Sequence, residues 1–300
     1  MRTKTYLFAL MAMALTLGSC SDNENGIGGE TSKYITVSTS IGNMTRVATD
    51  ANGGQTFEEG DEISVYAWTG APTVAPETSE RVVNNAINKL TNGSWVATPQ
   101  MLWKNNRDKH YFIGVYPVSA ISDLSAGEYA FDETKQVESD LLVAVNKDGL
   151  SYSADAQQTV PLTFTHVMAK LAVNLTYKNQ WGGIPTVEKV VVGNAAKEAT
   201  INYLTKVVTP STTAKEDFSL PEITENTKYV SVIIPQEDVK QLTIVIGGKN
   251  FVYDNGTPFK LESGKITTVN LEVGRDEIKL GDVKITNWED GSTFSGEALN

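Results

Sequence analysis

The chain has 300 residues, of which 40% are hydrophobic and 20% charged, a balance typical of a globular protein. Its formal net charge is −11, and because so acidic a chain repels phosphate backbones we expect no nucleic-acid partner. One cysteine and two histidines exclude an intramolecular disulfide and a three-histidine metal site. We therefore expect no metal site.

The first 19 residues have the layout of a secretory signal peptide. Arg2 and Lys4 give a basic start, and an apolar run follows that is too short to span a membrane. The run ends in Leu-Gly-Ser-Cys at residues 17–20, which resembles a bacterial lipobox. We predict a signal peptide over residues 1–19, lipidation of Cys20, and a polar tether over residues 20–33. An ordinary signal peptide with no lipid attachment is the alternative.

From Tyr34 onward, apolar residues recur with a period of two, which indicates half-buried β-strands. Asn92-Gly93 separates two such runs and predicts a hairpin turn. The predicted strands cover residues 35–41, 62–68, 87–90, 94–96, 111–116, 141–145, 171–175, 189–192, 229–234, 242–246, 251–253, 266–271 and 283–286.

Many short strands separated by Gly, Asn and Pro favour an all-β fold of antiparallel sandwiches over a parallel α/β sheet. The polar run at residues 146–159 predicts a boundary, with one sandwich over residues 34–158 and a second over residues 159–300. The chain has no dinucleotide-binding, P-loop, zinc-protease or serine-hydrolase motif. We therefore expect no catalytic residues and no cofactor, and a hydrolase has no specific support because no pair of carboxylates stands out.

An ordered set of phrases resembles the fimbrillin (Mfa-like) family of the Bacteroidota, the subunits of type V pili. The acidic residues after Cys20 are similar to the surface-export signal of lipoproteins from these bacteria. The resemblance covers nearly the whole chain after the signal peptide. The phrases that carry it are MTRV at 44–47, FEEGDEISVY at 57–66, SW at 94–95, LW at 102–103, YFIGVYP at 111–117, DLLVA at 140–144, VPLTFTHVMAKL at 160–171, IPQ at 234–236 and VKITNW at 283–288.

This resemblance implies two transthyretin-like β-sandwich domains in tandem. It also implies a lipoprotein that reaches the outer membrane, is cut after an arginine and loses its first strand. A donor strand from another pilus subunit then fills the groove, and the assembled fimbria supports adhesion. The expected partners are other pilus subunits through strand exchange and the outer membrane through the lipid anchor, with a host protein or glycan as a further partner.

The sequence offers residues for each of these steps. Cleavage is expected between Arg46 and Val47, in a Gly-rich stretch accessible to proteases, although a solvated surface arginine fits equally well. The groove-filling first strand would use Ile35, Val37, Thr39 and Ile41, and the candidate donor strand Ile278, Leu280, Val283 and Ile285. An ordinary C-terminal strand fits the last four residues equally well.

A non-polymerising surface lipoprotein that binds glycan or host protein is the alternative function. It is motivated by the five tryptophans, although we expect most of these in the core. His166 is expected to be a satisfied polar residue between a strand and a neighbouring loop. Its pairing with a metal or substrate would need a second ligand nearby.

Overall fold

The computed structural model describes residues 33–42, 56–152, 159–254, 256–275 and 278–288. These residues form 19 β-strands and only two short 3-10 helices, η1 (Thr78–Glu80) and η2 (Asn179–Trp181). The prediction of an all-β fold is confirmed. The described residues include no helix long and apolar enough to cross a membrane.

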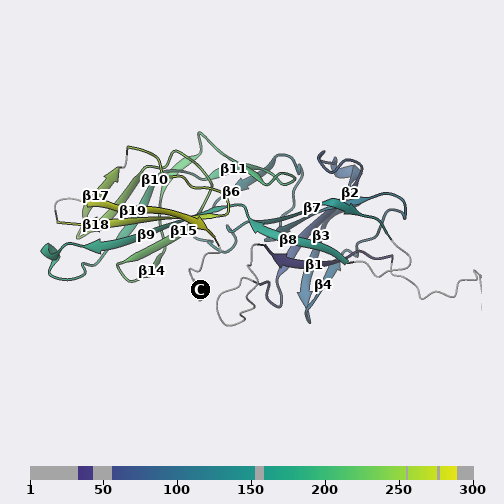
Figure 1. Cartoon of the computed structure of the whole chain (residues 1–300), viewed down its shortest axis with the longest axis horizontal. Coiled ribbons are helices and arrows are strands. Elements are labelled where there is room, and N and C mark those ends of the chain that lie inside the picture. Colours follow the sequence, from purple (N-terminus) through teal and green to yellow (C-terminus); the bar gives the residue numbers. More distant parts are fainter. Residues whose placement is uncertain (1–32, 43–55, 153–158, 255, 276–277, 289–300) are drawn as a thin grey trace, which may run out of the picture.

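A seven-stranded sheet occupies one end of the molecule (Figure 1) and has the order β1-β8-β7-β5-β2-β3-β4. Every neighbouring pair is antiparallel except β1 and β8, which run parallel. The predicted Asn92-Gly93 hairpin is confirmed, since it joins β3 to β4 with positive φ at both residues. The strands are β1 (Thr36–Ile41), β2 (Glu62–Thr69), β3 (Val83–Thr91), β4 (Ser94–Thr98), β5 (His110–Tyr116), β7 (Leu142–Leu150) and β8 (Thr159–His166).

Both faces of this sheet are buried at its central strands, whereas β1, β4 and β8 also carry exposed residues. On one face, residues such as Val37, Val65 and Phe164 form a hydrophobic cluster that we call the inner cluster. On the other face, residues such as Tyr66 and Ile113 belong to a larger cluster that continues into the rest of the molecule. The central strands β2 and β5 therefore read as nearly continuous apolar runs, as strands buried on both faces do.

The remaining strands form three sheets, of which the five-stranded and four-stranded ones lie at the other end of the molecule, while β6 and β11 lie nearer its middle (Figure 1). The five-stranded and four-stranded sheets both contribute to the larger cluster, for example through Val173 and Val190. Their orders are β14-β15-β9-β18-β19 and β13-β10-β16-β17, and the third sheet has the order β12-β11-β6. The strands are β6 (Gly127–Ala130), β9 (Ala169–Tyr177), β10 (Lys189–Ala196), β11 (Glu198–Asn202), β12 (Val207–Pro210), β13 (Lys215–Ser219), β14 (Glu222–Thr224), β15 (Lys228–Ile233), β16 (Gln241–Ile246), β17 (Lys249–Asp254), β18 (Lys265–Val273) and β19 (Ile278–Asn287).

The division of the chain into two tandem domains stays a prediction, and a boundary at residue 158 would separate β8 from β1 and β7, the strands with which it pairs. The run expected to be a loop also begins inside a strand, because β7 continues to Leu150 opposite His110 of β5. This end of β7 is mostly half-buried or exposed. A polar composition there does not distinguish a strand end from a loop.

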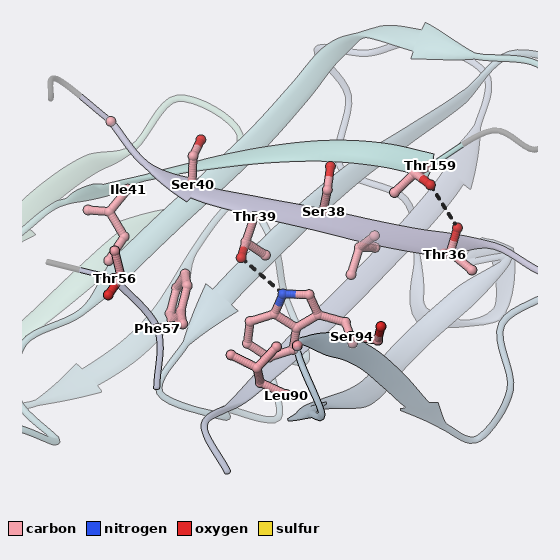
Figure 2. Close-up of a pocket in the computed structure, with 14 residues that line it drawn as sticks. Thr36, Ser38, Thr39, Ser40, Ile41, Thr56, Phe57, Leu90, Ser94 and Thr159 are labelled. Atoms are coloured by element: carbon pink, nitrogen blue, oxygen red, sulfur yellow. Dashed lines mark hydrogen bonds between the residues drawn. The ribbon is translucent and has the colours of Figure 1, made fainter. Parts of the chain in front are cut away.

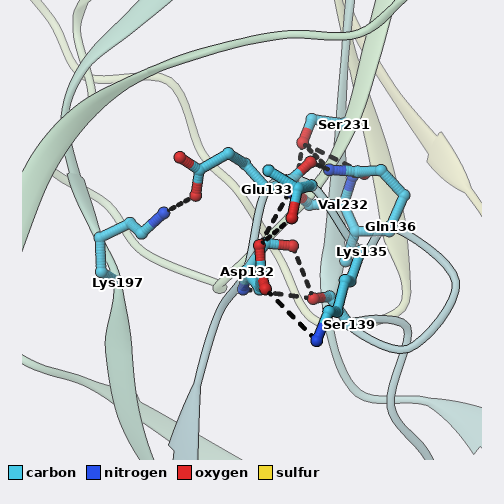
Figure 3. A network of polar contacts seen from close by, with 9 residues as sticks. Asp132, Glu133, Lys135, Gln136, Ser139, Lys197, Ser231 and Val232 are labelled. Carbon is cyan, nitrogen blue, oxygen red and sulfur yellow. Dashed lines mark hydrogen bonds and ion pairs between the residues drawn. The ribbon is translucent and has the colours of Figure 1, made fainter.

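The connection between β6 and β7 joins the two ends of the molecule through a polar network (Figure 3). Gln136 donates from Nε2 to Ser231 Oγ at 3.0 Å and accepts at Oε1 from Val232 N at 2.7 Å, so it bonds directly to β15. Glu133 of the same connection forms an ion pair with Lys197. These contacts attach the segment between β6 and β7, which leads into the seven-stranded sheet, to the other half of the chain.

Candidate functional site

The first strand, β1, lies at the edge of its sheet, and β8 is the strand with which it pairs. It pairs in parallel with β8, from Thr36 opposite Thr159 to Ile41 opposite Phe164. Hydroxyl pairs reinforce this edge, with Thr36 and Thr159 Oγ1 atoms 3.2 Å apart and Ser40 Oγ donating to Thr163 at 3.2 Å. Parallel pairing is slightly weaker per residue than antiparallel pairing. β1 is therefore a terminal edge strand whose partner strand is β8, and the residues just before it, 33–35, also bond to the backbone of residues 101–103.

The alternating side chains of β1 point into the inner cluster as the sequence predicts. Ile35 is 1% exposed and Val37 is 6% exposed, whereas Thr39 and Ile41 are half-buried. Ile35 also donates its backbone N–H to Met101 O at 3.0 Å. The residues predicted to fill a groove thus complete the core of the seven-stranded sheet, and their loss would open that core to solvent.

A groove of about 850 Å³ runs along the other side of β1, between the two outer strands of the sheet (Figure 2). One wall is β1 itself, and Leu90, Ser94 and Trp95 from the β3–β4 hairpin line the other. Figure 2 shows Thr39 on the side of β1 that faces Trp95, and Ser38 and Ser40 on the opposite side of the strand. The seven-stranded sheet therefore curls until its two edges face each other across this space.

One side-chain hydrogen bond crosses the groove. The indole Nε1 of Trp95 on β4 donates to Thr39 Oγ1 on β1 at 3.0 Å, drawn as the dashed line from Thr39 in Figure 2. Trp95 also packs edge-on against Phe57, with ring centroids 5.4 Å apart. Neither aromatic is among the residues that the sequence predicts for this site. The sequence feature that points to Trp95 is its position just after the Asn92-Gly93 turn, on β4, which forms the opposite edge of the sheet.

Phe57 is the centre of an aromatic cluster at the end of the groove. Its ring makes edge contacts with Tyr116 at 5.4 Å and Phe164 at 5.1 Å. Burial, followed by the nearby Asp61 carboxylate, raises the pKa of Tyr116 to about 12, so its hydroxyl stays neutral. Aromatic rings therefore surround Phe57 at this end of the groove.

The last strand, β19, is the edge strand of the five-stranded sheet and pairs only with β18. A bulge at Gly281-Asp282 lets the four candidate donor residues face the same side, opposite the buried row of β18. Ile278 and Leu280 pack on the larger cluster, but Val283 is 40% exposed and Ile285 is 39% exposed. The second half of β19 is thus an apolar strand that its own sheet buries incompletely.

Trp288 follows β19 and attaches its end to the seven-stranded sheet. Its ring stacks on His166, the last residue of β8, at 4.2 Å and 10° between planes. His166 Nδ1 lies 2.7 Å from Asp140 Oδ1, which confirms that this histidine is a satisfied polar residue between a strand and a loop. Lys170 Nζ lies 4.1 Å from the centre of the Trp288 ring, and burial lowers the pKa of this lysine against the opposing effect of Asp140.

The five tryptophans do not form an exposed platform. Trp68 and Trp288 are buried, and the other three are half-buried. Each has an aromatic or imidazole ring as a neighbour. The expectation that most tryptophans belong to the core or its edge is confirmed.

Three predicted residues, Cys20, Arg46 and Val47, lie outside the described residues. Their assignments as lipidation and cleavage sites stay predictions. Among the residues that the structure does describe, no three His, Cys, Asp or Glu side chains are grouped to hold a metal ion.

Comparison with known proteins supports this arrangement of strands. A family model described as fimbrillin-like matches residues 45–288. No curated protein sequence matches the chain.

Solved structures share the fold at low sequence identity. A Bacteroides uniformis protein proposed to act in cell adhesion is 17% identical, with a TM-score of 0.64 over 86% of this chain and 100% of that one. A fimbrial protein from Bacteroides vulgatus is 13% identical, with a TM-score of 0.53 over 86% and 100%. The tip fimbrial protein Mfa3 from Porphyromonas gingivalis, with a C-terminal truncation, is 11% identical, with a TM-score of 0.50 over 77% and 95%.

Proposed function

Because this chain belongs to the fimbrillin-like family, whose members are structural subunits and not enzymes, we propose that it assembles into a fimbria by exchange of its first strand for a donor strand. In this proposal the chain is exported as a lipoprotein, attached to the outer membrane through Cys20, and cut between Arg46 and Val47. Loss of β1 then leaves a groove that a strand from another subunit fills, and the assembled fimbria supports adhesion.

The observation that carries the proposal is the way β1 is held. Ile35 and Val37 are almost fully buried in the inner cluster, yet β1 pairs with one strand of its sheet, β8, and lies at the edge of that sheet. Arg46 follows Ile41 by five residues in the sequence. A cut there would break the covalent link between β1 and the rest of the fold, and release of β1 would then expose both the edge of β8 and an apolar groove, which is the requirement for strand addition.

The exposure of β19 supplies a driving force in the same direction. Its Val283 and Ile285 are 40% and 39% exposed, whereas the corresponding sites under β1 bury their side chains to 1% and 6% exposure. Moving such residues into the groove of another subunit would bury more apolar surface, at about 25 cal/mol per Å². Backbone hydrogen bonds to β8 would add register and direction.

The proposal is tested by treating the purified chain with an arginine-specific protease. We expect a new N-terminus at Val47 and SDS-resistant ladders on gels, because each cut subunit presents a groove and each β19 can fill one. Arg46→Lys preserves the charge but not the cleavage site and serves as the control. Cleavage at Val47 without any polymer would contradict strand exchange. If the Arg46→Lys variant polymerises as well as the unaltered chain, the proposed role of the cut is wrong.

The membrane attachment is tested separately. In cells, the Cys20→Ala chain should leave the membrane fraction and lose incorporation of labelled lipid, since a thiol is required for the anchor. Electron microscopy of cells carrying the unaltered chain or Arg46→Ala then asks whether fimbriae depend on processing. Persistent membrane attachment of the Cys20→Ala chain would show that lipidation is not the anchor.

A further inference from the structure

The side chains that β1 directs into the seven-stranded sheet include one hydrogen-bond acceptor. From its start, the inward row reads Ile35, Val37, Thr39, and Thr39 accepts the Trp95 indole N–H at 3.0 Å. A half-buried indole N–H left without an acceptor loses a hydrogen bond that folding had exchanged for one with water. Any strand that takes the place of β1 therefore loses this hydrogen bond unless it brings an oxygen to the same position.

The last strand repeats this pattern. The order Ile-x-Val-x-Thr at residues 35–39 corresponds to Val-x-Ile-x-Asn at residues 283–287 and to Ile-x-Leu-x-Asp at residues 278–282. Both segments place two aliphatic residues and then an oxygen acceptor on one side of an extended strand. The match ends there, because residue 289 is a glutamate where β1 has the half-buried Ile41.

Two observations favour the second half of β19 over the first. Val283 and Ile285 are about 40% exposed in their own sheet, whereas Ile278 and Leu280 already pack on the larger cluster. Asn287 would also bring a neutral amide to the groove, and a neutral group loses less solvation on burial than the Asp282 carboxylate. In the present fold, Asn287 is bonded to Lys265, so its oxygen is occupied until β19 leaves its sheet.

From these observations, and resting on the strand exchange proposed above, we infer that Trp95 selects the donor strand. Residues 283–287 of a second copy of this chain take the register of residues 35–39, in the same N-to-C direction beside β8. Val283 and Ile285 fill the sites of Ile35 and Val37, and Asn287 Oδ1 accepts the Trp95 N–H. Trp95 is thus a specificity-determining residue of the groove.

The first measurement uses the intact chain and does not depend on strand exchange. Thr39→Val removes the acceptor at nearly constant volume, and Trp95→Phe removes the donor. We expect the Thr39→Val change to raise the unfolding equilibrium constant about fivefold in the Trp95 chain, the effect of one hydrogen bond, and much less in the Trp95→Phe chain. Equal effects of Thr39→Val in both backgrounds would show that the two side chains are not coupled and would overturn the inference.

The second measurement uses the full chain after cleavage by an arginine-specific protease, with fluorescent peptides of residues 34–42 and 278–289. Thr39→Val in the first peptide and Asn287→Leu in the second should each weaken uptake by about five- to tenfold. Asp282→Leu, the matched control for the other register, should leave uptake unchanged. In the Trp95→Phe chain the Thr39→Val and Asn287→Leu differences should disappear.

The outcomes distinguish strand replacement from selection of the donor strand by Trp95. If the cleaved chain takes up none of the peptides, strand replacement is wrong and the assignment of the donor register is wrong with it. If it takes up all of them with equal affinity, strand replacement stands and selection by Trp95 is wrong. A loss with Asp282→Leu in place of Asn287→Leu would overturn the register in favour of residues 278–282.

Discussion

His110, at the start of β5, is a fully buried polar side chain whose contacts fix its protonation state. Its Nε2 accepts the Lys104 backbone N–H at 3.0 Å, and its Nδ1 lies 3.1 Å from the carbonyl oxygen of Asp108. Only the neutral ring with the proton on Nδ1 satisfies both contacts. Burial, the largest effect, lowers the pKa of His110 from its ordinary value of 6.5.

This arrangement predicts a pH dependence of stability. The pKa of His110 is lower in the folded chain than in the unfolded chain, so below about pH 6.5 the unfolded chain binds the proton more readily. The free energy of unfolding should therefore fall as pH drops below 6.5, and this part of the fall should be absent in His110→Gln. Imidazole NMR is decisive because the chain has only two histidines. A titration of His110 at or above pH 6.5 would contradict the prediction.

At the scale of elements, β1 and β19 are both edge strands, but their sheets bury them differently. β1 places Ile35 at 1% exposure against the inner cluster, whereas β19 leaves Ile285 at 39% exposure. The same residue type therefore contributes differently to stability at the two ends of the chain. In the proposed assembly, the strand that is buried leaves, and the strand that is exposed becomes buried in another subunit.

A pair of matched substitutions follows from this difference. Ile35→Ala should lower the free energy of unfolding by about 2–5 kcal/mol, because it removes a buried side chain and leaves a cavity. Ile285→Ala should cost less than about 1 kcal/mol in the monomer. Urea unfolding of the two full-length variants measures both values. Similar losses would mean that β19 is as firmly packed as β1 and has no surplus apolar surface to bury on assembly.

At the scale of the whole molecule, the connection of residues 117–141 joins the seven-stranded sheet to the other half. It leaves β5, pairs β6 with β11, and returns to β7 after bonding β15 through Gln136. Ser231, one of the groups bonded to Gln136, is fully buried. The two halves are therefore connected by satisfied polar contacts in addition to the shared larger cluster.

Replacing Gln136 tests this connection. Gln136→Leu leaves the Val232 N–H without its acceptor, which should lower the free energy of unfolding by about 1–3 kcal/mol. The adjacent Lys135→Ala is the matched control, since Lys135 and its partner Asp132 are both exposed and its loss should cost about 0.5 kcal/mol or less. Calorimetry should give a lower melting temperature for Gln136→Leu alone. Equal melting temperatures for the two variants would show that the network does not hold the halves together.

Periodicity by itself identified the all-β class, the Asn92-Gly93 hairpin and the inward row of β1, because alternation and turn chemistry are local properties of the chain. The burial preferences of the residue types, not periodicity, led to the expectations that most of the five tryptophans lie in the core and that His166 lies beside a loop. The resemblance to fimbrillins rested on ordered phrases along the chain, and the family match over residues 45–288 agrees with it.

Only the tertiary structure decided which strands are neighbours. Composition does not reveal that β8 pairs with β1 in parallel, since strand order depends on contacts between residues more than 100 positions apart. The same holds for the groove, because Trp95 and Thr39 meet only when the sheet curls and brings its two edges together. The exposure of Val283 and Ile285 likewise depends on the absence of a further strand beside β19 in the described sheet. Local sequence sets which side of a strand is apolar, but long-range packing sets what that side meets.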